Sequence, residues 1–211
     1  MSFNRKVVVV GDTGCGKTSL ILAFTQGSPA SGELPTTAEL LEVDSPVPGS
    51  QVSLSLWDTA NRGDFEQLRD ICYTVADIIL ICFSIDSPQS LSNVKEQWAL
   101  KALHFCSTTP TILVGCKKDL RREPDPKPSN RLSKVMKKLA IRKEDPRSDE
   151  NTKLNDTLSP VQPKQVTSKE ATKVCYEIGA KAYLECSAVT LEGVQQVFET
   201  AARAMIHYRS N

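Results

Sequence analysis

Short apolar runs and amphipathic segments alternate along this chain. The runs at Lys6–Val10, Ile78–Ser84 and Thr111–Cys116 contain few polar side chains, which is typical of strands buried on both faces of a parallel sheet. Residues 52–56 instead alternate apolar with polar side chains, and they predict a strand nearer the edge of that sheet.

Segments with helical spacing of apolar residues separate the predicted strands. We expect helices over residues 17–26, 64–73, 88–105, 168–178 and 193–206. The fourth helix has a start signal, because Thr167 and Glu170 have the spacing of a capping box. Strand and helix therefore alternate, which predicts a doubly wound α/β fold.

Residues 123–164 interrupt this regular order. They are rich in Pro, Asp, Lys and Ser, with a single amphipathic stretch at residues 130–140. We predict a short helix there, followed by a loop over residues 141–161 that few apolar side chains anchor. A solvated surface excursion and a partner-binding role remain equal alternatives for this segment. The length of 211 residues fits one domain, residues 1–211.

Charge and cysteine content narrow the classes of function. The chain has 26 Lys and Arg against 25 Asp and Glu, and a net charge of +1 argues against nucleic acid as the main partner. Seven cysteines without C-x-x-C pairs fit neither a disulfide scaffold nor a zinc site. We therefore expect a cytoplasmic protein, since the sequence shows neither a signal core nor a membrane-length apolar run.

A phosphate-binding motif follows the first predicted strand. Residues 11–18 match G-x-x-x-x-G-K-[ST], in which glycines let backbone N–H groups surround phosphate oxygens. Lys17 supplies a positive charge to the β- and γ-phosphates, and Thr18 offers a hydroxyl to Mg²⁺. A plain glycine turn between strand and helix is the alternative, but the complete spacing after a Val-rich strand favours a nucleoside triphosphate site.

Two aspartates at predicted strand ends complete a nucleotide site. Asp58 stands where a carboxylate holds Mg²⁺ through water. Asp119 ends the Gly115–Asp119 segment, where it can accept hydrogen bonds from N1–H and N2–H₂ of guanine. Adenine lacks that pair of donors, so Asp119 favours GTP over ATP.

The chain resembles the Ras superfamily and, within it, the Rho family. The likeness is carried by Leu56–Ala60, Cys82–Pro88, Asn93–Val94 and Glu185–Ala188, and by an amphipathic stretch at the place of the Rho insert. The resemblance implies a P-loop NTPase fold of the small G-protein type, with a mostly parallel six-stranded sheet and helices on both faces. It also implies GTP or GDP and Mg²⁺ as cofactors, Rho-type effectors and regulators as partners, and a role in signal transduction and cytoskeleton regulation.

The same resemblance assigns roles to single residues. The metal ligands would be Thr18 and Thr36, the latter in the first switch. Lys117 would lie against the guanine plane, and the region of Ser187 and Ala188 would contact the guanine carbonyl. The implied nucleotide-binding set is Thr13, Gly14, Cys15, Gly16, Lys17, Thr18, Thr36, Asp58, Lys117, Asp119, Ser187 and Ala188.

Three positions depart from the pattern of a hydrolysing Rho protein. Asn61 and Arg62 stand where members normally have Gly and Gln, and a guanidinium has no acceptor for the proton of the attacking water. Thr13 replaces a glycine that leaves room for the arginine of an activating protein. These changes predict a GTP-bound protein with no intact catalytic set, similar to the Rnd-type Rho proteins, which also carry Cys where Cys116 stands.

Two alternatives stay open, and with them the question of whether this protein is an enzyme. Arg62 can act as a built-in arginine in an active GTPase, or the chain can be a pseudo-GTPase that serves as an interaction module.

Pro29 and Glu33 replace aromatic residues of the first switch, which favours fast exchange of the nucleotide. Residues 38–41 form an altered effector loop, and no lipid site is visible, so we expect membrane attachment only if a lipidated tail is missing from this sequence.

Overall fold

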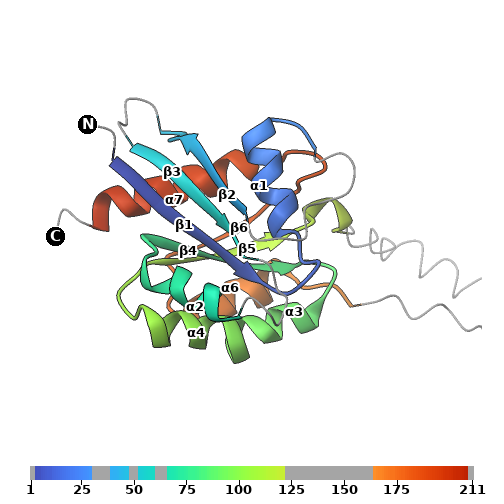
Figure 1. Cartoon of the computed structure of the whole chain (residues 1–211). Coiled ribbons are helices and arrows are strands. Elements are labelled where there is room, and N and C mark those ends of the chain that lie inside the picture. Colours follow the sequence, from blue (N-terminus) through green and yellow to red (C-terminus); the bar gives the residue numbers. More distant parts are fainter. Residues whose placement is uncertain (1–2, 30–38, 48–51, 60–65, 122–163, 209–211) are drawn as a thin grey trace, which may run out of the picture. The chain divides into compact units, whose positions relative to one another are not determined.

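The residues that the structure describes form a six-stranded sheet with helices on both faces. The computed structural model describes residues 3–29, 39–47, 52–59, 66–121 and 164–208 (Figure 1). The strands are β1 (Phe3–Gly11), β2 (Glu39–Asp44), β3 (Val52–Asp58), β4 (Ile78–Ser84), β5 (Thr111–Cys116) and β6 (Ala182–Glu185). Their order in the sheet is β2-β3-β1-β4-β5-β6. The β2–β3 pair is antiparallel and the other pairings of the described strands are parallel, as the predicted fold requires.

Helices cover both faces of this sheet. They are α1 (Lys17–Gln26), α2 (Glu66–Thr74), α3 (Pro88–Asn93), η2 (Val94–Trp98), α4 (Ala99–Phe105), η3 (Lys118–Leu120), α6 (Ser168–Glu177) and α7 (Val194–Tyr208). Helices α1 and α7 pack on one face, whereas α2, α3, α4 and α6 pack on the other (Figure 1). The predicted doubly wound α/β fold is therefore confirmed.

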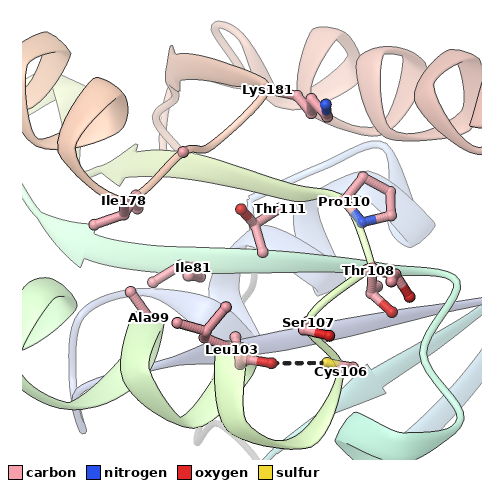
Figure 2. Close-up of a pocket in the computed structure, with 13 residues that line it drawn as sticks. Ile81, Ala99, Leu103, Cys106, Ser107, Thr108, Pro110, Thr111, Ile178 and Lys181 are labelled. Carbon is pink, nitrogen blue, oxygen red and sulfur yellow. Dashed lines mark hydrogen bonds between the residues drawn. The ribbon is translucent and has the colours of Figure 1, made fainter.

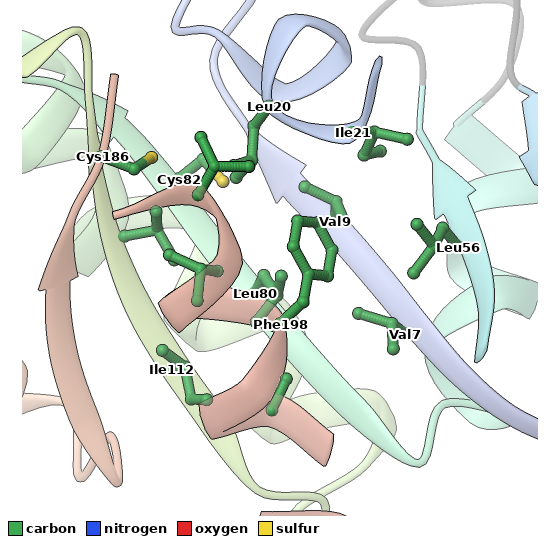
Figure 3. Close-up of a cluster of buried hydrophobic side chains, with 14 of the residues drawn as sticks. Val7, Val9, Leu20, Ile21, Leu56, Leu80, Cys82, Ile112, Cys186 and Phe198 are labelled. Carbon is green, nitrogen blue, oxygen red and sulfur yellow. The ribbon is translucent and has the colours of Figure 1, made fainter. Parts of the chain in front are cut away.

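Strand β1 shows why the sheet needs cover on both sides. Val7 and Val9 point into the core with α1 and α7, while Val8 and Val10 point into the core with α2, α3, α4 and α6. All four side chains are fully buried, because alternate residues of a strand face opposite sides. In the first core, Phe198 of α7 lies over the sheet (Figure 3) and stacks on Phe24 of α1 at 4.0 Å between ring centroids.

The structure differs from the predicted elements at two strands and within one helix. Strands β2 and β6 were not assigned to residues, since β2 begins inside the predicted effector loop and β6 has four half-buried residues. The expected helix over 88–105 contains a π turn, η2, in which the N–H of Ala99 bonds to the carbonyl of Val94. The predicted helix at 130–140 and loop at 141–161 lie outside the described residues.

The capping box that starts α6 is confirmed. The Thr167 hydroxyl accepts a hydrogen bond from the Glu170 N–H at 3.2 Å, and the Glu170 carboxylate accepts one from the Thr167 N–H at 2.8 Å. Within the described part of the chain, no helix is long and apolar enough to cross a membrane.

Candidate nucleotide site

The phosphate loop is a tight turn between β1 and α1. Gly11 has a φ of 142°, and a Cβ there would lie 2.1 Å from the carbonyl oxygen of Cys82. A side chain at Gly11 would therefore push the loop off the sheet. At Gly14, with a φ of 73°, a Cβ would meet nothing within 4 Å. The space above Gly14 is open, as the close approach of a phosphate requires.

Lys17 lies inside the loop, with 7% of its surface exposed. Its Nζ donates hydrogen bonds to the carbonyl oxygens of Gly11 at 2.9 Å and Asp12 at 2.8 Å. An ammonium group has three N–H donors, and these two bonds fix its position without satisfying its charge. The loop thus presents a fixed positive charge, which suits a β- or γ-phosphate.

A hydroxyl and a carboxylate are in contact beside the phosphate loop. The Thr18 hydroxyl, at the start of α1, donates a hydrogen bond to the Asp58 carboxylate at 2.5 Å, and Asp58 is 6% exposed at the end of β3. The adjacent Thr59 donates to the carbonyl oxygen of Val9 at 2.7 Å, which holds the end of β3 against β1. A hydroxyl and a carboxylate in contact fit Mg²⁺, which prefers oxygen ligands in such a site.

Two loops at the carboxyl ends of β5 and β6 are joined through Asp119. Its carboxylate accepts a hydrogen bond from the fully buried Ser187 hydroxyl at 2.5 Å. The same hydroxyl accepts from the backbone N–H groups of Val189 and Thr190 at 3.2 and 3.1 Å. The N–H of Lys118 donates to the carbonyl of Cys186 at 3.0 Å. This arrangement orients Asp119, as reading a guanine edge requires.

Four buried thiols lie in the core next to the phosphate loop; Cys15 belongs to the predicted nucleotide-binding set, but its grouping with the other three was not predicted. They belong to Cys15, Cys82, Cys116 and Cys186, and all are 3% exposed or less. Burial raises the pKa of Cys15 to about 12, so it stays a thiol at neutral pH. Hydrogen bonding to Cys116 and burial raise the pKa of Cys82 and of Cys186, whereas accepting those bonds lowers the pKa of Cys116.

An ion pair lies beside the loops that contain Asp119 and Ser187. Arg121 binds the Glu185 carboxylate through Nη2 at 2.5 Å and Nε at 3.2 Å. Burial alone would raise the pKa of Glu185, but hydrogen bonds from Tyr183 and Ser168 and the Arg121 charge lower it. Because Glu185 directly precedes the loop with Ser187, this pair holds that loop in place. No signal in the sequence linked two residues 64 positions apart.

The structure gathers most of the predicted site residues at one edge of the sheet. The loop residues, Asp58, Asp119 and Ser187 all lie at the carboxyl ends of the parallel strands, the usual ligand edge of such folds. Thr13 is exposed on the phosphate loop, and Ala188 is half-buried and packs against the core beside α7. Thr36, Asn61 and Arg62 lie outside the described residues.

A separate cavity of about 360 Å³ lies away from these residues. It is bounded by α4, the start of β5 and residues 178–181, with Leu103, Pro110 and Lys181 among its lining side chains (Figure 2). The cavity is at the amino end of β5, whereas Asp119 follows the carboxyl end of that strand. It is therefore distinct from the nucleotide site.

The fold and the loop geometry define a phosphate-loop nucleotide-binding protein. The family model described as "Ras family" matches residues 6–207. The "GTP-binding protein rho5" of Schizosaccharomyces pombe is 43% identical over 200 residues, covering 95% of this chain and 86% of the relative. The "GTP-binding protein RHO1" of Saccharomyces cerevisiae is 41% identical over 209 residues, covering 99% of this chain and 87% of the relative.

A third relative agrees with these two. The "GTP-binding protein RHO1" of Candida albicans is 42% identical over 205 residues, covering 97% of this chain and 89% of the relative. The chain belongs to the Ras family and, within it, to the Rho-type GTP-binding signalling proteins. Proteins of this family bind guanine nucleotide, typically with Mg²⁺, and act through effectors and regulators.

Proposed function

We propose that this protein is a Rho-like switch that holds GTP, hydrolyses it poorly and exchanges it rapidly. The observation that carries the binding part is the assembled site, in which Lys17 lies inside the loop and Asp119 is held by Ser187. Thr18 directly, and Asp58 through water, would hold the Mg²⁺ that screens the phosphate charge when the nucleotide is bound. Thr36 is proposed as a further ligand of that ion.

Impaired hydrolysis is proposed from three side chains. The resemblance places Arg62 where a hydrolysing member has the Gln that orients the attacking water, and Asn61 where it has a Gly beside the γ-phosphate. Arg62 can stabilise negative charge, but it cannot accept a proton from water. Thr13 is exposed on the phosphate loop, which fits a side chain in the path of an activating arginine. An arginine supplied in that way is worth about 10³ to 10⁵ in rate.

Rapid exchange is proposed from the first switch. Pro29 is exposed at the end of the segment that follows α1, where the family places an aromatic residue against guanine. Losing that contact removes about 1 kcal/mol, which corresponds to about a fivefold faster dissociation. Rho-type effectors and regulators remain the proposed partners, and the changed residues 38–41 favour a different subset of them.

Base selection tests the binding part directly. Asp119→Ala removes the acceptor for two guanine donors, and each such charge-assisted bond contributes about 1.5 kcal/mol or more. We expect GTP affinity to fall about a hundredfold or more, and the preference over ATP to disappear, in titrations with fluorescent nucleotides. Ser187→Ala keeps the carboxylate and should lose much less affinity. Equal GTP affinity in the wild type and Asp119→Ala would contradict this proposal.

The same fluorescent GTP analogue tests the exchange rate. Dissociation is followed after addition of excess unlabelled GTP, with a Rho protein that carries the aromatic residue measured alongside. We expect this chain to release the analogue about five times faster. Release as slow as from that control protein would contradict rapid exchange and leave the binding proposal intact.

A further inference from the structure

Asp12, a position that the phosphate-loop motif leaves free, is tied to a distant helix. Its Oδ1 accepts a hydrogen bond from Trp98 Nε1 at 2.8 Å, and its Oδ2 accepts one from Asn93 Nδ2 at 2.7 Å. Both oxygens of a loop carboxylate are thus bound by neutral donors from α3 and η2. Sequence reasoning gave Asp12 no role, because 81 and 86 positions separate it from these partners.

The π turn explains how both donors reach one carboxylate. Asn93 and Trp98 are five residues apart, and in a regular α-helix they would point about 140° away from each other. In η2, the bond from the Ala99 N–H to the Val94 carbonyl spans five residues instead of four. This wider turn brings residues five apart onto the same side of the helix. Such turns are frequent at functional sites.

The two donors are held firmly in place. Trp98 is 3% exposed and Val94 is fully buried, and both pack in the core beneath α3 and α4. Asn93 is half-buried, and its Oδ1 accepts a hydrogen bond from Gln89 at 2.9 Å. Because these side chains are packed and bonded, they fix Asp12 rather than follow it.

Asp12 in turn fixes the centre of the loop. Its carbonyl oxygen accepts the bond from Lys17 Nζ at 2.8 Å and another from the Cys15 N–H at 3.3 Å. A displacement of Asp12 would therefore move the ammonium that faces the phosphates. A carboxylate in such a loop also repels an anion, and the two donors disperse its charge and turn it toward the helix.

We propose that Asn93 and Trp98 are positioning residues for nucleotide binding, acting through Asp12 to set the phosphate loop. This inference rests on the proposed guanine-nucleotide function. It assigns to the π turn the role of joining the loop to the helical run 88–105. It also predicts that the Trp98 indole responds when the loop gains or loses a nucleotide.

Exchanging the donor and the acceptor of the hydrogen bond between Asn93 and Asp12 tests this proposal. Asn93→Asp places two carboxylates face to face, and we expect nucleotide to dissociate at least about tenfold faster, as the loss of one charge-assisted bond implies. In the double variant Asp12→Asn with Asn93→Asp, the bond re-forms with opposite polarity, and dissociation should return to within about threefold of the wild type. Gln97→Glu adds the same charge at an exposed position of η2 and serves as the matched control.

The dissociation rate and the melting temperature together distinguish a positioning role of Asn93 from a merely structural role. A merely structural role would lower the melting temperature of Asn93→Asp while the dissociation rate stayed at the wild-type value, and that result would overturn the inference. Failure of the double variant to recover would also overturn it. If the wild type bound no guanine nucleotide, the proposed function and this inference would fall together, whereas normal binding with unchanged variants would sink the inference alone.

The indole N–H of Trp98 gives a second readout. In ¹H–¹⁵N spectra we expect its resonance to shift on nucleotide release and on Asp12→Asn substitution, with Trp57→Phe used to assign the two indole signals. A Trp98 resonance that stays in place in both experiments would contradict the coupling.

Discussion

At the scale of single residues, the site depends on places where no side chain fits. Gly193 lies between the loop with Ser187 and the start of α7, and its φ is 74°. A Cβ there would lie 2.2 Å from the carbonyl oxygen of Glu185. Gly179 has a similar φ of 68°, but a Cβ there would meet nothing within 4 Å. Alanine substitution at Gly179 therefore tests backbone strain alone, whereas substitution at Gly193 adds steric overlap.

These glycines give a matched pair of variants. Gly179→Ala should cost about 1–2 kcal/mol in free energy of unfolding, because it strains the left-handed backbone. Gly193→Ala should cost more than about 3 kcal/mol, since the end of β6 and the start of α7 must also move apart. Urea denaturation of the two variants measures both values. Equal losses would show that the overlap at Gly193 is relieved without disturbing the site.

Residues also show what the sequence could and could not predict. The placement of Lys17, Thr18 and Asp58 at one site was predictable, because these residues belong to a local motif or to a strand end. The bond between Asp119 and Ser187 joins positions 68 apart, and its geometry depends on the neighbouring strands β5 and β6. The grouping of the buried thiols and the Asp12 contact were missed for the same reason, since only the folded sheet brings these residues together.

At the scale of elements, local signals predicted some boundaries well. The capping box at Thr167 starts α6 as expected, because its two hydrogen bonds involve residues three apart. Strand β6 was missed because four half-buried residues give no clear alternation. The π turn within 88–105 was missed because the apolar spacing of the segment also fits a regular helix.

The capping box predicts a pH dependence. Hydrogen bonds from the Thr167 backbone and hydroxyl lower the pKa of Glu170 to about 2, below its usual value. A depressed pKa means that the carboxylate stabilises the folded state above its unfolded pKa, and that this stability is lost as pH falls through about 2. Lowering the pH from about 5 to 2 should therefore reduce the stability of the wild type more than that of Glu170→Gln.

The expected difference between these two proteins is about 0.5–1 kcal/mol, because Glu170 lies at the surface where water screens its interactions. Thermal unfolding across that pH range measures it. Glu185 remains in both proteins, so its own titration cancels in the comparison. Parallel pH profiles for the wild type and Glu170→Gln would contradict a stabilising charge at this cap.

At the scale of the whole molecule, the sheet brings the two halves of the site together. The phosphate loop follows β1, and the base-side loops follow β5 and β6, with β4 between them. The carboxyl ends of these parallel strands meet at one edge, where ligands bind in such folds. The fold class was predictable because strand and helix alternate in the sequence, whereas the fit of the loops to each other required the folded structure.

We propose that this site binds GTP and keeps it uncleaved. Single-turnover hydrolysis tests it most directly: protein loaded with γ-labelled GTP and Mg²⁺ is followed for phosphate release, beside an active Rho protein. We expect release at least about tenfold slower than from the active protein, and recovery in the double variant Asn61→Gly with Arg62→Gln. Release from the wild type at the rate of the active protein would contradict the claim.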